Sequence, residues 1–169
     1  MTPQSADEGE AGATSLSALQ QRIRIEELLF GYCSLVDLLD IDGVVGLFTE
    51  DGVFDYGFGR VFKGREELRQ LFSRLALYEA TSHHLSNVRI TVGADLTARA
   101  ESVLYAYHVR SEGSEEIRLW ARYSDFLVLD GGHWRFQRRQ LRAAAEKGTS
   151  PPAHLDTQYE RIDRKRPIS

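Results

Sequence analysis

The first part of the chain repeats apolar residues with the period of an amphipathic helix. From Ser15 to about Leu39, apolar side chains recur at steps of three, four or seven residues. They are Leu19, Ile23, Phe30 and Cys33. This spacing predicts a helix that carries these side chains on one apolar face, and Ser15 or Ser17 can cap its start.

Two shorter helices and a short strand are predicted next. Residues 44–48 have the pattern of a short helix, and residues 53–56 form a short β-prone run. Gly64 opens a third helix, which ends near Tyr78. The apolar residues of this helix form one stripe, made of Leu68, Leu71, Phe72 and Leu75.

After residue 81 the pattern becomes that of β-strands. The strands are predicted over residues 84–92, 97–109, 117–129 and 134–142. Short connectors rich in Gly, Asp and Ser join them, as hairpins require. Sequential hairpins make an antiparallel meander, and helices gathered in front of it make the fold class α+β. We expect a cone whose curved antiparallel sheet wraps over the N-terminal helices and leaves a pocket between the layers.

The two ends of the chain differ in character from the middle. Residues 1–14 are small, polar and acidic, and they lack the basic start and apolar centre of a signal peptide. We expect them to form a disordered tail. Residues 146–169 contain a Pro-Pro pair and a charged stretch, and are predicted to form a second, solvated tail. One domain over residues 15–145 remains.

Composition argues against several classes of protein. The 169 residues carry 21 Lys+Arg and 25 Asp+Glu, a net charge of −4, whereas a nucleic-acid partner requires a basic face. No apolar run approaches the roughly 20 residues that span a bilayer, so no membrane partner is expected. The single cysteine, Cys33, excludes an intramolecular disulfide and any multi-cysteine metal site. We expect a soluble, cytoplasmic protein.

A carboxylate follows the apolar face of the first helix. Asp37 lies four residues after Cys33 and seven after Phe30. A carboxylate that is buried alone costs several kcal/mol or more, so on this face it must be paired, hydrogen-bonded or directed into a cavity. The alternative is that the helix ends early and that Asp37 belongs to a solvated cluster with Asp40 and Asp42.

Two adjacent histidines open the first strand of the meander. Strict alternation places His84 on the face of Val88 and Ile90, and His83 on the opposite face with Asn87. A β-bulge would exchange the two faces, so either histidine can face the pocket. Histidine titrates near neutrality, and one that meets a carboxylate is a natural general base, although a structural hydrogen bond is the alternative. We expect no metal site, because adjacent strand residues point apart and no HExxH motif accompanies them.

Six short motifs occur in an order that is typical of one family. They are Tyr32 with Asp37 on the first helix, and then DGVFDY (51–56), KGRE (63–66), TSH (81–83), ARYSD (121–125) and DGGHWRF (130–136). Over roughly residues 16–142 the chain resembles the SnoaL-like branch of the NTF2-like superfamily. This resemblance implies a cone with a deep, mostly apolar pocket, and a homodimer or homotrimer formed through the outer face of the sheet.

The resemblance also implies roles for individual residues. In the dehydratases of this family, an aspartate on the first helix orients a histidine at the start of the strand after the third helix. The matching positions are Asp37 and His83. Tyrosines of individual dehydratases match Tyr32 and Tyr56, and a phenol can donate a hydrogen bond to a developing oxyanion.

The predicted function is acid/base catalysis without cofactor or metal on an apolar polycyclic or polyketide-like molecule. Dehydration is favoured over isomerisation and cyclisation, which share its enolate chemistry. The predicted substrate-binding residues are Phe54, His84, Asn87, Tyr105, Tyr107, Trp120 and Tyr123. The alternative is a non-catalytic ligand-binding or assembly module, because the same fold serves such roles.

Overall fold

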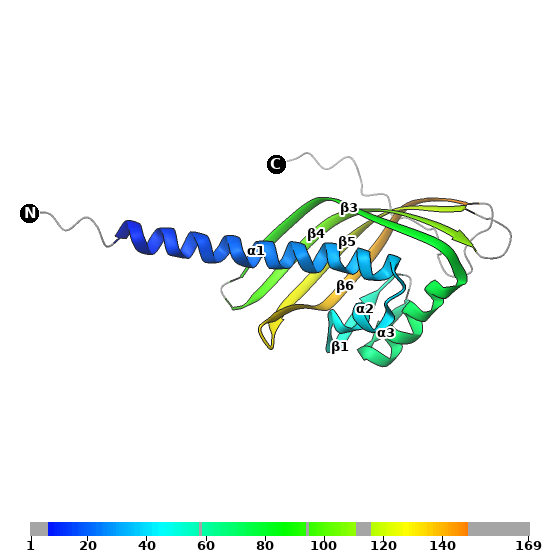
Figure 1. Cartoon of the computed structure of the whole chain (residues 1–169), viewed down its shortest axis with the longest axis horizontal. Coiled ribbons are helices and arrows are strands. Elements are labelled where there is room, and N and C mark those ends of the chain that lie inside the picture. The colour runs from blue at the N-terminus through cyan, green and yellow to red at the C-terminus, as the bar shows by residue number, and fades with distance from the viewer. Residues whose placement is uncertain (1–6, 58, 94, 111–115, 149–169) are drawn as a thin grey trace, which may run out of the picture.

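The computed structural model describes residues 7–57, 59–93, 95–110 and 116–148, with side chains from Ser17 onward. Helices lie against one face of a curved six-stranded sheet, which is the predicted α+β cone (Figure 1). The elements are α1 (Asp7–Asp37), α2 (Ile41–Gly46), β1 (Phe48–Asp55), β2 (Val61–Lys63), α3 (Gly64–Ser73), the 3-10 helix η1 (Arg74–Leu77), β3 (Tyr78–Val92), β4 (Thr97–Arg110), β5 (Glu116–Asp130) and β6 (His133–Lys147).

The sheet has the strand order β2-β1-β6-β5-β4-β3. Strands β3 to β6 form the predicted antiparallel meander, each longer than or equal to its predicted span. Strand β1 pairs in parallel with β6, and β2 pairs antiparallel with β1. Neither pairing was predicted, and β1 already begins at Phe48, where the sequence predicted helix. The predicted second helix lies slightly earlier, because Asp40 caps it by accepting from the Gly43 N–H at 2.8 Å.

Helix α1 buries a different face from the one predicted. Its core side chains are Ile25, Leu28, Leu29, Tyr32, Cys33 and Val36. Of the predicted stripe only Cys33 is buried, whereas Leu19, Ile23 and Phe30 are about half exposed. The prediction was wrong because α1 carries apolar residues on two faces, so its periodicity does not select the one that meets the sheet.

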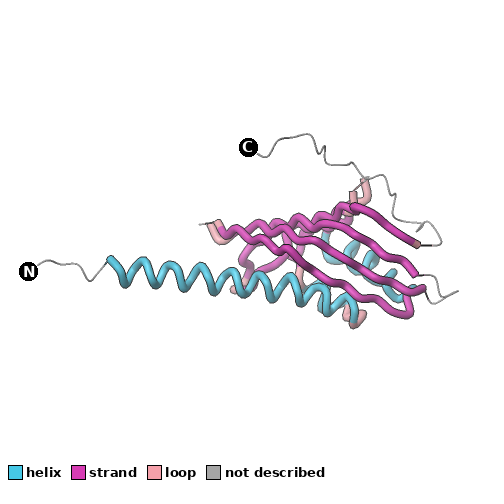
Figure 2. The backbone as a smooth tube through the Cα atoms, turned by 90° about the horizontal axis from the view of Figure 1, so that it is seen from above, coloured by secondary structure: helices cyan, strands magenta, loops and turns pink. Residues whose placement is uncertain are grey.

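The ends of the domain also differ from the prediction. Helix α1 begins at Asp7 rather than at Ser15, and its first part extends beyond the sheet (Figures 1 and 2). At the other end, β6 continues to Lys147, two residues into the predicted C-terminal tail. The rest of that tail, from residue 149, and residues 1–6 of the N-terminal tail lie outside the described residues.

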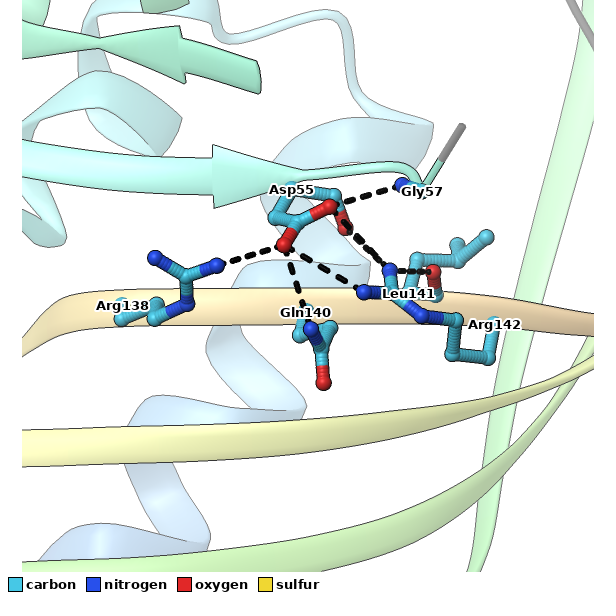
Figure 3. A network of polar contacts seen from close by, with 6 residues as sticks. All are labelled: Asp55, Gly57, Arg138, Gln140, Leu141 and Arg142. Atoms are coloured by element: carbon cyan, nitrogen blue, oxygen red, sulfur yellow. Dashed lines mark hydrogen bonds and ion pairs between the residues drawn. The ribbon is translucent and has the colours of Figure 1, made fainter. Parts of the chain in front are cut away.

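A buried carboxylate joins β1 to β6 (Figure 3). Asp55 accepts hydrogen bonds from the Gly57 N–H at 2.7 Å, Arg138 at 2.5 Å, Gln140 at 3.1 Å and Arg142 at 3.1 Å. Burial raises the pKa of Asp55, but the bonds from Arg142, Gly57 and Gln140 outweigh it and hold this pKa at about 2. The network therefore fixes the parallel pairing that brings the end of β1 to the site described below.

Replacing Asp55 with Asn is expected to destabilise the fold by about 1–3 kcal/mol, since hydrogen bonds to a charged group are lost. The pKa of Asp55 is lower in the folded chain than in the unfolded one. Its contribution is therefore complete above about pH 4 and is lost as the pH falls toward 2. Urea unfolding of wild type and variant across this range measures the difference. Equal loss of stability on acidification in both proteins would contradict this role.

Candidate active site

A cavity of about 120 Å³ lies between the inner face of the sheet and the helices. Its apolar lining comes from Val36, Phe62, Leu71, Phe72, Leu75, Leu104, Leu119 and Leu141. Its polar and ionisable lining comes from Tyr32, Tyr56, Arg60, Arg74, Tyr78, His83, His108 and Tyr123. Three of the four predicted catalytic residues line this cavity: Tyr32, Tyr56 and His83. The fourth, Asp37, lies directly behind His83.

The carboxylate of Asp37, the last residue of α1, binds the beginning of β3 at three points. Its Oδ1 lies 2.7 Å from His83 Nδ1 and accepts from the Thr81 hydroxyl at 2.9 Å. Its Oδ2 accepts from the backbone N–H of His83 at 2.9 Å. Burial raises the pKa of Asp37, but the contacts with His83 and Thr81 outweigh it and bring this pKa below its usual value. Asp37 is therefore ionised near neutral pH, and its carboxylate only accepts hydrogen bonds.

The contact between Asp37 Oδ1 and His83 Nδ1 determines which tautomer the imidazole of His83 adopts. An ionised carboxylate has no proton to donate, so the proton between the two groups belongs to His83 Nδ1. In the neutral ring Nε2 then carries a lone pair. The side chains of His83 and Asp37 are 8% and 26% exposed, so the pair is largely shielded from water. The arrangement can accept a proton from a molecule in the cavity and stabilise the resulting imidazolium.

A bulge in β3 decides which histidine faces the cavity. The pairing of β3 with β4 shifts in register between Ser86 and Arg89, and Asn87 adopts a positive φ of 51° within this shift. Because of the extra residue, His83 before the bulge and Val88 after it lie on the same, inner face. The simple alternation had separated them.

His108 is a site residue that the sequence reasoning missed. It lies on β4 beside the Asp37–His83 pair, with its ring centroid 5.0 Å from that of His83 and 4.8 Å from that of Tyr78. Burial, and next the charge of His83, lower the pKa of His108 to about 4. His108 is therefore neutral near pH 7. Strand alternation was the available signal. Leu104 and Ala106 of β4 point into the core, so His108, two residues further on, points inward as well.

The low pKa of His108 predicts acid sensitivity of the fold. The unfolded chain takes up this proton near pH 6.5 and the folded chain near pH 4, so stability falls as the pH is lowered between them. The expected slope from this group is on the order of 1 kcal/mol per pH unit. His108→Gln should flatten the dependence of the unfolding free energy on pH over this window. An equally steep curve in the variant would show that another group is responsible.

The tyrosines of the cavity are protonated donors. Burial raises the pKa of Tyr56 to about 12 and raises that of Tyr32 well above its ordinary range. Burial also raises the pKa of Tyr123 well above its ordinary range, although the charge of Arg139 opposes this rise. Phe54 was predicted to bind substrate, but it is fully buried beneath Tyr56, with ring centroids 4.6 Å apart, and does not line the cavity.

Five further predicted binding residues lie away from the cavity. They are His84, Asn87, Tyr105, Tyr107 and Trp120. Alternation on β4 and β5 turns Tyr105, Tyr107 and Trp120 to the outer face, where Trp120 is 40% exposed and its ring centroid is 5.5 Å from that of Tyr105. His84 is exposed, and its Nε2 lies 2.9 Å from the Ser82 hydroxyl. Of the seven predicted substrate-binding residues, the structure therefore places only Tyr123 at the cavity.

Two further findings concern the described residues alone. They contain no group of three or more His, Cys, Asp or Glu side chains arranged to hold a metal ion. None of the helices within them combines the length and apolar character needed to cross a membrane.

Fold and site together define a class of protein. A curved, unclosed sheet wrapped over helices around an apolar cavity is the cone fold of the NTF2-like superfamily. The SnoaL-like domain family matches residues 17–140, and the chain belongs to this family.

One curated relative and two solved structures are similar to this chain over most of its length. An uncharacterised protein of Mycobacterium tuberculosis (strain H37Rv) is 28% identical over 133 residues, which are 74% of this chain and 86% of the relative. The structure of a provisionally assigned scytalone dehydratase from Novosphingobium aromaticivorans is 27% identical, with a TM-score of 0.76 over 82% of this chain and 93% of that one. The hexachlorocyclohexane dehydrochlorinase LinA-type3 of Novosphingobium barchaimii is 20% identical, with a TM-score of 0.71 over 82% and 99%, and shares the fold.

Proposed function

We propose that this protein is a cofactor-independent acid/base enzyme, a dehydratase in the first instance, acting on a mostly apolar small molecule. The observation that carries the proposal is the Asp37–His83 pair, 2.7 Å apart, at an apolar cavity. A carboxylate held in this way is costly to shield from water. A module that only binds apolar ligands has no need of it. The resemblance to a provisionally assigned scytalone dehydratase supports elimination of water as the reaction.

The reaction follows from the proton positions. His83 Nε2 takes a proton from the carbon next to a carbonyl, and the electron pair of that C–H bond forms the enolate. Collapse of the enolate expels a hydroxyl group from the neighbouring carbon, and the imidazolium returns its proton to that group, so that water leaves. Asp37 holds the tautomer and stabilises the imidazolium throughout. Acid/base catalysis of this kind contributes about 10²–10⁴-fold to the rate.

The phenols supply the second part of the mechanism. Tyr56 and Tyr32 are protonated near neutral pH and line the cavity, so either can donate to the enolate oxygen or to the leaving group. A fixed donor in a site with little water stabilises the developing charge more than water does. His108, neutral beside His83, offers a further polar group to the same space.

Deuterium uptake tests the proposal without knowledge of the substrate. Ring ketones such as 1-indanone and 2-tetralone, incubated with the protein in D₂O, are expected to exchange the protons next to the carbonyl faster than in buffer. His83→Gln should reduce this exchange to the background rate. His84→Gln is the matched control, because it changes the neighbouring, outward-facing histidine, and should exchange like wild type. Mass spectrometry measures the uptake.

Two outcomes would contradict the proposal. Undiminished exchange in His83→Gln would show that this histidine is not the base. Saturable binding of the ketones without exchange by the wild type would favour the non-catalytic binding module.

A further inference from the structure

Two arginines stand on the solvent side of the catalytic cavity. Arg60, from the loop between β1 and β2, is half-buried, and its guanidinium lies 5.7 Å from the centroid of the Tyr56 ring. Arg74, at the start of η1, is exposed and lines the same cavity. Both charges act on the Tyr56 phenol, where they oppose the rise of its pKa. Among the described residues, neither guanidinium has a carboxylate within ion-pair distance.

The surrounding charges keep this side of the cavity positive. Arg110 pairs with Tyr78 in the register of β3 and β4, and Tyr78 lines the cavity. Like Arg60 and Arg74, Arg110 forms no ion pair among the described residues. The opposing group is Glu146, which is close enough to act on Tyr78 and whose pKa is raised by burial. Among the described residues whose charges act on Tyr56 and Tyr78, three are arginines and one is a carboxyl group, on a chain whose net charge is −4. A local charge opposite to that of the whole chain favours an anionic ligand.

The size of the cavity limits the apolar part of that ligand. Its volume of about 120 Å³ is close to the roughly 150 Å³ of an apolar cavity that holds benzene. One ring therefore fits in the cavity that His83 and Leu119 line, and the polar part of a larger molecule can reach the arginines that line it too.

We infer that the substrate is a ring compound carrying a carboxylate, which Arg60 and Arg74 hold at the open side of the cavity while the ring reaches His83. The inference rests on the proposed function for the chemistry and adds the class of substrate. Guanidinium groups suit a carboxylate because their planar fork matches its two oxygens.

Matched acids and amides test this inference by equilibrium binding. Calorimetry compares benzoate with benzamide, and 2-naphthoate with 2-naphthamide, which differ only in the charged group. We expect wild type to bind at least one acid about tenfold more tightly than its amide at low salt. The Arg60→Gln/Arg74→Gln variant should lose this preference while keeping its affinity for the amide, which shows that the cavity is intact. Arg89→Gln, an exposed arginine of β3, is the control and should keep the preference.

Each contrary result overturns a definite part of the inference. Equal affinity of wild type for acid and amide, or no saturable binding of any of these compounds, would exclude an aromatic acid. A preference that survives in the double variant would exclude the two arginines. Tighter binding of 2-naphthyl phosphate than of 2-naphthoate would exclude a carboxylate as the recognised group.

The calorimetry tests ligand binding and the deuterium exchange tests catalysis, so the failure of one can be distinguished from the failure of the other. Asp37→Asn should keep the preference for acid over amide, since its carboxylate contacts Thr81 and His83 and neither of the two arginines. A charge preference without deuterium exchange would therefore leave this inference standing and refute only the proposed enzyme activity.

Discussion

Asp37→Asn is expected to reduce turnover by about 10³–10⁴-fold and to leave ligand affinity nearly unchanged. The amide can present its NH₂ group to His83 Nδ1, which then becomes the acceptor and moves the ring proton to Nε2. That nitrogen is the one that must accept the substrate proton. The amide also removes the negative charge that stabilises the imidazolium. Deuterium uptake and ligand calorimetry on the same protein separate the two effects.

The nitrogen chemical shifts of His83 distinguish this positioning role from a structural one. In wild type they should report a proton on Nδ1, and in Asp37→Asn a proton on Nε2, with the remaining amide spectrum preserved. Asp42→Asn makes the same chemical change on exposed α2, where Asp42 pairs with Arg69, and should behave like wild type. Equal losses of affinity and exchange in Asp37→Asn would indicate a disturbed fold instead.

Local patterns predicted the parts of the structure that depend on local chemistry. The hairpin connectors gave the order and the antiparallel pairing of β3 to β6. The placement of Asp37 near His83 came from the family resemblance, and the structure brings the two together. The choice between His83 and His84 could not be made, because it depends on the bulge at Asn87. Asn tolerates positive φ, but nothing in an isolated sequence shows that it adopts it here.

Long-range pairing accounts for the remaining misses. The parallel contact of β1 with β6 joins residues at least 85 positions apart, and its polar support, Asp55 with Arg138 and Arg142, has no local signature. Packing against the sheet determines which face of α1 is buried, and the helical periodicity of the sequence does not reveal this face. Tyr105 and Trp120 were assigned to the site by residue type, whereas the strand alternation that carries His108 inward turns them outward.

A second long-range feature supports the floor of the cavity. Arg139 of β6 is fully buried and forms two 2.9 Å hydrogen bonds with the two carboxylate oxygens of Asp125. Its guanidinium lies 4.1 Å from the ring centroid of Tyr32 and 4.0 Å from that of Tyr123. Burial acts to lower the pKa of Arg139, but the Asp125 carboxylate outweighs it and keeps this pKa above its usual range. Burial raises the pKa of Asp125, and the charge and hydrogen bonds of Arg139 oppose this rise. The two parallel hydrogen bonds are the geometry of an ion pair, and both cavity tyrosines stack against it.

Arg139→Met is expected to destabilise the fold by about 3–5 kcal/mol, because it leaves the Asp125 carboxylate buried without a partner. Arg139→Met/Asp125→Leu should recover most of this loss, since two apolar side chains then fill the space without an uncompensated charge. Urea unfolding measures both, with Arg118→Met as control, because the Arg118–Glu116 pair on β5 is exposed and should contribute little. A double variant as unstable as the single one would show that the rings around Arg139, rather than its charge partner, determine its contribution. A stable double variant with reduced deuterium exchange would show instead that the ion pair is retained to hold Tyr32 and Tyr123 in place.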